Sequence, residues 1–160
     1  MISDQQYEED FFAPLAAASA SFGGRDGATL DTEKAKVLIL PVPYAATTTY
    51  MPGTRQGPSA ILQASQHLEL LDDETGQEVF RIGIATLEEI EVDVSSPQAM
   101  VAKVRSLGEK ILNAGFFPLM LGGEHLLSLG MIQAVASRTV DLSILQLDAH
   151  ADLRQTYQGT

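Results

Sequence analysis

Short apolar runs alternate with amphipathic stretches along the chain from about residue 36 onward. The runs at 37–43 (VLILPVP), 116–123 (FFPLMLGG) and 141–147 (DLSILQL) are continuous, which is typical of strands that are buried on both faces. A further strand is expected around Phe80–Ile84, within EVFRIGIATL. These segments predict a sheet whose strands lie in the interior of the molecule.

Helical spacing of apolar residues appears between the predicted strands. The clearest helix runs from about 97 to 114, where apolar residues recur at intervals of three and four and Gly115 provides the stop. A second helix is predicted over 126–138, and a third begins at Pro58 with helical spacing that continues to Leu71. Because strands and helices alternate, the chain is predicted to be an α/β protein with a mostly parallel sheet.

The composition limits the classes of protein to which the chain can belong. Its 160 residues are 45% hydrophobic and include no cysteine, so thiolate metal sites and disulfides are excluded. No apolar run is long enough to cross a bilayer, and the acidic start MISDQQYEED is unlike a signal peptide. The net charge of −11 argues against a nucleic-acid partner. We therefore expect a cytoplasmic protein that binds neither membrane nor nucleic acid.

Three ionisable side chains follow the last apolar run at every second position, namely Asp148, His150 and Asp152. In an extended strand such residues project to the same side, and open parallel sheets bind their ligands at the carboxyl ends of the strands. Two carboxylates and an imidazole at such close range favour a cation between them. Taken alone, the group is equally compatible with a solvated strand end that pairs with Arg154.

A second polar cluster ends the preceding predicted strand. Gly122 and Gly123 permit a sharp turn before Glu124 and His125. One helix and one strand separate His125 from Asp148, which is the length of a crossover to a neighbouring parallel strand. A sulfur-free set of imidazoles and carboxylates suits Mn²⁺, with Fe²⁺, Ni²⁺ and Zn²⁺ less favoured. The predicted metal ligands are His125, Asp148, His150 and Asp152.

These two motifs resemble those of a known family. GGEH at 122–125, followed by DAHAD at 148–152, is similar to the ureohydrolases, which include the arginases and agmatinases. The upstream stretch PVPYAATTTYMPGTRQGPSAI looks like the agmatinase branch. The resemblance implies a three-layer α/β/α, arginase-like fold, of which residues 35–160 would form the N-terminal part. Residues 1–34 are expected to form an irregular segment before it.

The resemblance also implies a role for each candidate ligand. His125 would bind one Mn²⁺, Asp148 would bridge two Mn²⁺ ions, and His150 would bind the second. Asp152 would bind the first ion and orient the shared hydroxide, which is its catalytic role. The implied reaction is hydrolysis of a guanidino compound to urea and an amine, because two Mn²⁺ ions hold hydroxide at neutral pH. Agmatine is the favoured substrate, while guanidinobutyrate, arginine and guanidine stay open.

Family members carry a later Asp-x-Asp pair of ligands that does not occur in these 160 residues. We therefore expect this chain alone to be inactive, and we expect the full-length enzyme to form homotrimers or homohexamers. Two alternative functions stay open. One is an amide deacetylase with the arginase-like fold, and the other is a non-catalytic ureohydrolase-like subunit that serves assembly.

Overall fold

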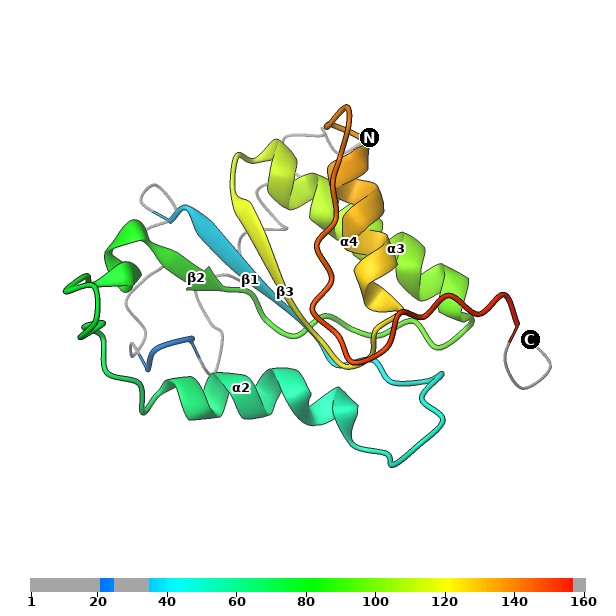
Figure 1. Ribbon diagram of the computed structural model, residues 1–160, viewed down its shortest axis with the longest axis horizontal. Helices are drawn as coiled ribbons and strands as arrows, with labels where there is room; N and C mark the ends of the chain where they lie inside the picture. The colour runs from blue at the N-terminus through cyan, green and yellow to red at the C-terminus, as the bar shows by residue number, and fades with distance from the viewer. Residues whose placement is uncertain (1–20, 25–34, 157–160) are drawn as a thin grey trace, which may run out of the picture.

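The protein folds around a small parallel sheet, which confirms the predicted fold class. The computed structural model describes residues 21–24 and 35–156, so most of the segment 1–34 lies outside the described residues. The strands are β1 (Val37–Val42), β2 (Ile84–Thr86) and β3 (Phe117–Gly122). They lie in the order β2-β1-β3, with β1 paired in parallel to both neighbours (Figure 1).

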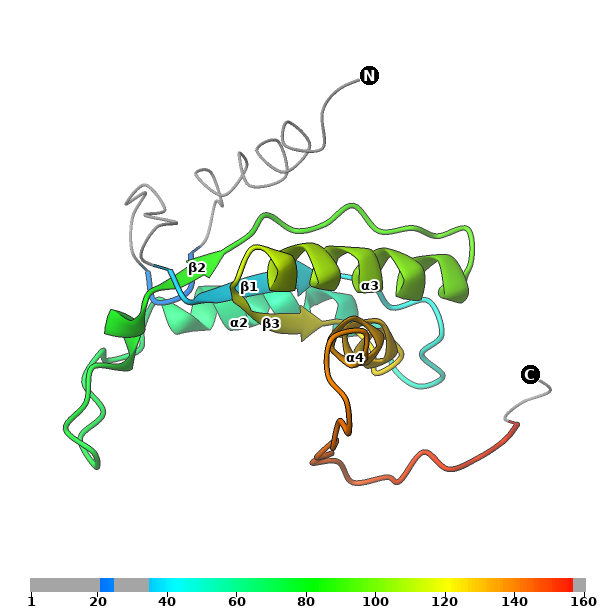
Figure 2. The same ribbon diagram turned by 90° about the horizontal axis from the view of Figure 1, so that it is seen from above.

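Helices cover both faces of this sheet. Helix α2 (Gly57–Ser65) lies on one side, and α3 (Pro97–Asn113) and α4 (Leu127–Ala136) lie on the other (Figures 1 and 2). Two short 3-10 helices, η2 (Thr54–Gln56) and η3 (Val79–Ile82), precede α2 and β2. The arrangement is a three-layer α/β/α fold. Within the described residues, no helix combines the length and the apolar character that a membrane crossing requires.

The main core lies between β1 and the α3–α4 layer. Leu38, Leu40 and Val42 of β1 are fully buried. They belong to one apolar cluster with side chains of α3, β2 and α4, which include Met100, Val104, Ile111, Ala85 and Leu127. Side chains alternate along a strand, so the intervening Ile39 and Pro41 point to the other face, where α2 packs on β1. Burial on both faces explains why β1 reads as a continuous apolar run.

Helix α3 has clear signals at both ends. The hydroxyl of Ser96 accepts a hydrogen bond from the Ala99 backbone N–H at 3.1 Å and so caps the first turn. Pro97 follows in the first turn, where a backbone N–H would have no partner within the helix, so the N–H that proline lacks is not missed. Gly115, with φ +86°, ends the helix in the left-handed conformation that glycine adopts most readily. The predicted helix over 97–114 is therefore confirmed.

Close approach of α3 and α4 depends on two glycines. A Cβ added at Gly130 would lie 2.6 Å from the Val101 carbonyl oxygen and 2.8 Å from Val104 Cβ. A Cβ added at Gly108 would lie 2.9 Å from Ala134 Cβ. These contacts set how closely α4 packs on α3. Since α4 begins two residues after His125, they also help to set the position of that residue.

The predicted strand over 141–147 is wrong. These residues form an irregular segment in which Leu145 and Leu147 are 84% and 89% exposed, and within the described residues no strand pairs with them. An apolar run becomes a strand only where a neighbouring strand accepts its hydrogen bonds. The outer edge of β3 carries no partner in the described part of the chain, so an edge is free, but residues 141–147 do not pair with it.

Two smaller predictions also differ from the structure. The strand expected around Phe80–Ile84 begins only at Ile84, because residues 79–82 turn into η3 and Gly83 follows with φ +81°. Helix α2 ends at Ser65, well before Leu71. The Ser65 hydroxyl donates to the Leu62 carbonyl at 2.7 Å, and backbone turns carry the chain away from the helix axis.

Candidate metal centre

His125 stands in the turn between β3 and α4, at the carboxyl edge of the sheet. Gly122 and Gly123 precede it, but neither has a positive φ. The turn needs Gly123 for space instead, because a Cβ there would run into the Tyr44 carbonyl oxygen and would lie 3.0 Å from Arg55 Cα. The predicted sharp turn is thus present, although its glycine serves close packing rather than backbone rotation.

The Asp-x-His-x-Asp segment is a loop rather than an extended strand end. The Asp148 carboxylate accepts a hydrogen bond from the His150 backbone N–H at 2.8 Å, which folds the chain into a local turn. The Gln146 side-chain amide donates to the His150 carbonyl at 3.1 Å. Asp152 has φ +49°, in the left-handed region that Asp tolerates better than most residues. The assumption that extended geometry continues past Leu147 is therefore wrong.

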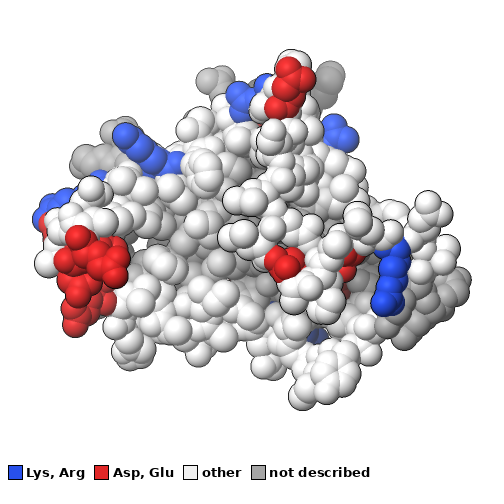
Figure 3. All heavy atoms as spheres, viewed as in Figure 1, with Lys and Arg blue, Asp and Glu red and all other residues white. Residues whose placement is uncertain are grey.

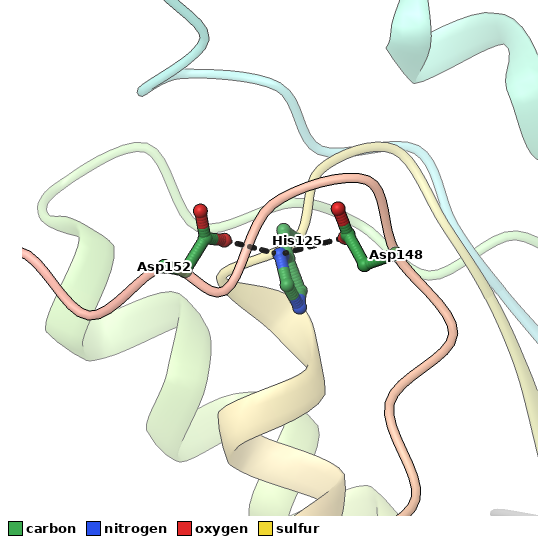
Figure 4. A group of neighbouring side chains, drawn as sticks. All are labelled: His125, Asp148 and Asp152. Atoms are coloured by element: carbon green, nitrogen blue, oxygen red, sulfur yellow. Dashed lines mark ion pairs between the residues drawn. The ribbon is translucent and has the colours of Figure 1, made fainter.

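Three of the four predicted ligands nevertheless come together. The Nδ1 atom of His125 lies 2.7 Å from Asp152 Oδ2 and 3.7 Å from Asp148 Oδ2. Figure 4 shows the imidazole between the two carboxylates, one on each side. One ligand atom from each residue lies within 4.8 Å of the others. A nitrogen and two oxygen donors at this spacing fit a divalent cation of the Mn²⁺, Fe²⁺ or Zn²⁺ kind.

His150 lies outside this group of three but next to it. Its Nδ1 atom is 3.7 Å from Asp148 Oδ1, whereas His125 faces the other oxygen, Oδ2, of the same carboxylate. The His150 side chain is 83% exposed. Asp148 therefore has an imidazole on each of its two oxygens. A single carboxylate between two imidazoles can bind two cations, one through each oxygen.

The environment of Asp148 favours its charged form. The hydrogen bond from the His150 backbone N–H is the main cause that lowers the pKa of this carboxyl group, and the nearby imidazoles of His125 and His150 act in the same direction. The carboxylate is thus ionised throughout the neutral range. An ionised carboxylate is the form that binds a cation.

The loop between β1 and α2 contributes residues that the sequence did not single out. Glu124 accepts two hydrogen bonds from Thr47, one from the backbone N–H at 2.9 Å and one from the hydroxyl at 2.7 Å. Tyr44 is buried beside them. Burial raises the pKa of its phenol, and the carboxylates of Glu124 and Asp93 add to this effect. Tyr44 and Thr47 belong to the upstream stretch that resembles the agmatinase branch, but that resemblance indicated no partner for either residue.

The acidic charge of the protein gathers partly away from this centre. On the face in Figure 3, Asp and Glu side chains cluster at the left end, over the segment that leads to η3. Asp72, Asp73 and Glu74 are exposed there. The net charge is therefore no argument by itself for a cationic substrate.

The parallel sheet with imidazole and carboxylate groups at its carboxyl edge defines an α/β protein with a candidate metal centre. The profile of the arginase family matches residues 35–160, which is most of the chain. The chain therefore belongs to the arginase family.

Individual relatives agree with this assignment. The chain is 35% identical over 127 residues to an agmatinase from Bacillus anthracis, covering 79% of this chain and 44% of the relative. It is 36% identical over 128 residues to an N(1)-aminopropylagmatine ureohydrolase from Thermus thermophilus, covering 80% and 44%. The solved agmatine ureohydrolase of Thermoplasma volcanium superposes with a TM-score of 0.72 at 29% identity, covering 80% and 42%. The chain thus spans less than half the length of these relatives.

Proposed function

We propose that this chain carries part of the active site of a manganese-dependent enzyme that hydrolyses a guanidino compound, with agmatine as the favoured substrate, to urea and an amine. The observation that carries the proposal is the meeting of His125, Asp148 and Asp152 at the edge of the sheet. Relatives named agmatinase and N(1)-aminopropylagmatine ureohydrolase support the substrate class.

The donor set supports a site for two ions. His125 and Asp152 would hold one ion together with Oδ2 of Asp148, and Oδ1 of Asp148 with His150 would hold a second. When bound, two Mn²⁺ ions supply Lewis acidity, which lowers the pKa of water and polarises the substrate. Fe²⁺, Ni²⁺ and Zn²⁺ fit the same donors less well.

Asp152 is the residue proposed to act on the attacking water. It faces His125 through Oδ2, so its other oxygen, Oδ1, would accept a hydrogen bond from the water and orient it towards the guanidinium carbon. Orientation matters here because this carbon is resonance-stabilised and a poor electrophile. The left-handed backbone at Asp152 fixes the direction in which the carboxylate leaves the loop.

Urea release tests the proposal. The Mn²⁺-loaded protein is assayed with agmatine, arginine and guanidinobutyrate, both as these 160 residues and as a hybrid in which residues 35–160 replace the matching part of the Bacillus anthracis agmatinase. We expect the hybrid to release urea from agmatine and to lose this activity on Asp152→Asn, while His67→Ala leaves it unchanged. A folded, manganese-containing hybrid that releases no urea, or an Asp152→Asn hybrid with full activity, would contradict the proposal.

The remaining expectations stay predictions. These are the inactivity of the 160 residues alone, the cytoplasmic location, and the assembly of the full-length enzyme into homotrimers or homohexamers. The urea assay addresses the first directly. Size-exclusion chromatography with light scattering on the full-length enzyme addresses the last.

A further inference from the structure

The β1–α2 loop and the turn that carries His125 interlock at three points. Gly123 packs against the Tyr44 carbonyl and the Arg55 backbone, which are near the two ends of the loop. Gly57, at the start of α2, is in ordinary van der Waals range of the Gly122 carbonyl, since a Cβ added there would be 3.6 Å from that oxygen. The third contact is the pair of hydrogen bonds that the Glu124 carboxylate accepts from Thr47, within the loop.

Glu124 holds Thr47 through both of its carboxylate oxygens. Oε2 accepts from the backbone N–H at 2.9 Å, and Oε1 accepts from the hydroxyl at 2.7 Å. The two residues are 77 positions apart, so this contact is a tertiary link and not a local turn. Hydrogen bonds to a charged acceptor are stronger than those between neutral groups.

The rest of the loop, beyond Thr47, is exposed. Beyond Thr47 the loop continues to Tyr50 and Met51, which are 83% and 69% exposed. Met51 has φ +47° and Gly53 has φ +132°, so the loop turns back sharply before η2. Residues 46–56 contain no buried side chain that would anchor the loop through apolar packing. Its position therefore relies on the close backbone packing at Gly123 and on polar contacts, among them the two hydrogen bonds from Thr47 to Glu124.

We propose that Glu124 is a positioning residue: by clamping Thr47, it holds the loop 45–53 against the His125 turn and so places this loop as one wall of the metal site. The part of the proposal that concerns substrate rests on the function proposed above. Glu124 directly precedes His125, and the loop leaves the same edge of the sheet from which His125 projects. In Figure 4 the β1–α2 segment (cyan) passes beside the turn that carries His125. The exposed tip would offer an apolar surface to the aliphatic part of a guanidino substrate.

Amide hydrogen exchange on the 160-residue chain tests the clamp without any need for activity. Glu124→Ala removes both acceptor oxygens, so neither bond from Thr47 can form; glutamine would not serve, because its N–H₂ group could donate to the Thr47 hydroxyl and keep both contacts. We expect exchange of the Thr47 amide to become faster by about tenfold, with amides of α3 unchanged. Glu124→Asp keeps both acceptors and should restore part of the protection. Glu109→Ala, which removes a carboxylate paired with Arg105 on α3, is the matched control.

Steady-state kinetics test whether the loop 45–53 forms a wall of the site. They are measured on the form, the 160-residue chain or the hybrid, that releases urea. If the loop contacts substrate, Glu124→Ala raises the KM for agmatine by about tenfold and leaves kcat within about twofold, because uniform binding is lost. Loss of folded enzyme alone would lower the apparent kcat and leave KM unchanged. Unchanged Thr47 exchange in Glu124→Ala overturns the clamp, and faster exchange with an unchanged KM overturns the wall. A wild-type protein without urea release counts against the proposed function, while the exchange result still decides the clamp.

Discussion

Replacing Gly130 with alanine should loosen the packing of α4 on α3 and lower the stability of the fold. The added methyl group would lie 2.6 Å from the Val101 carbonyl oxygen and 2.8 Å from Val104 Cβ. Ordinary contacts between such atoms are about 3.5 Å or longer, so the helices would have to separate by up to about 1 Å. The carbonyl oxygen belongs to the backbone of α3 and cannot rotate away.

Two opposing effects determine the size of the change. Alanine in place of glycine inside a helix contributes about 1 kcal/mol of stability through helix propensity. Overpacking in a well-packed core costs about 1–3 kcal/mol. Because the nearest atom is rigid backbone, we expect the upper part of this range, and a net loss of about 1–2 kcal/mol. For a chain of this length, that lowers Tm by roughly 2–8 °C.

Gly57→Ala is the matched control for this substitution. Gly57 has ordinary helical dihedrals, φ −51° and ψ −51°, and a Cβ there would meet only the Gly122 carbonyl oxygen, at a normal 3.6 Å. Alanine at such a position leaves stability unchanged or raises it by up to about 1 kcal/mol. Both variants are compared with the wild type by thermal and urea unfolding. If Gly130→Ala is as stable as Gly57→Ala, the close contact between α3 and α4 is not a constraint and the reasoning is wrong.

Three further predictions concern the core and the entry to α3. Ile111→Ala, which empties a fully buried site, should lower the free energy of unfolding by about 2–5 kcal/mol, whereas Val140→Ala at an 89% exposed site should change it little. Ser96→Ala removes the cap of α3 and should cost about 1 kcal/mol; a cost near zero would show that the capping bond is unimportant. Hydrogen bonds from the hydroxyl and the backbone N–H of Ser95 lower the pKa of Asp93. The ionised Asp93 carboxylate therefore stabilises the fold fully above the ordinary aspartate pKa, and this stabilisation is lost as the pH falls through the lower pKa of Asp93 in the folded protein. Ser95→Ala should raise that pKa in an NMR titration, and an unchanged value would contradict the assignment.

The elements with strong local signals were predicted well. Helix α3 has a cap, a regular apolar face and a glycine stop, and β1 is an apolar run closed by proline, so sequence and structure agree there. The segment 141–147 has the same apolar character as β1 but does not lie along the free outer edge of β3, and strand formation depends on such pairing rather than on the run itself. Local pattern was therefore sufficient only where the segment also pairs with or packs on other elements.

The candidate site was predicted in part. The sequence indicated that His125 would meet Asp148 and Asp152, and the structure brings these residues together. The reasoning behind this prediction was partly wrong, because the loop reaches His125 through a turn at Asp148 and a left-handed residue at Asp152. Strand alternation, which the prediction assumed, does not bring them together. This difference explains why His150 lies beside the group rather than in it. The link from Thr47 to Glu124 has no signature in the sequence, since it joins two distant segments by side-chain geometry alone.

Binding of Mn²⁺ to the 160-residue chain tests the central claim, that His125, Asp148 and Asp152 surround a metal ion. Electron paramagnetic resonance measures free Mn²⁺ during a titration of the wild type and of His125→Ala and Asp152→Asn. His67→Ala removes an exposed histidine elsewhere, and Asp73→Asn removes a carboxylate from the acidic segment before η3, so these two variants control for non-specific binding. We predict saturable binding that the first two substitutions abolish and the two controls leave intact. Equal binding by the wild type and His125→Ala would contradict the account.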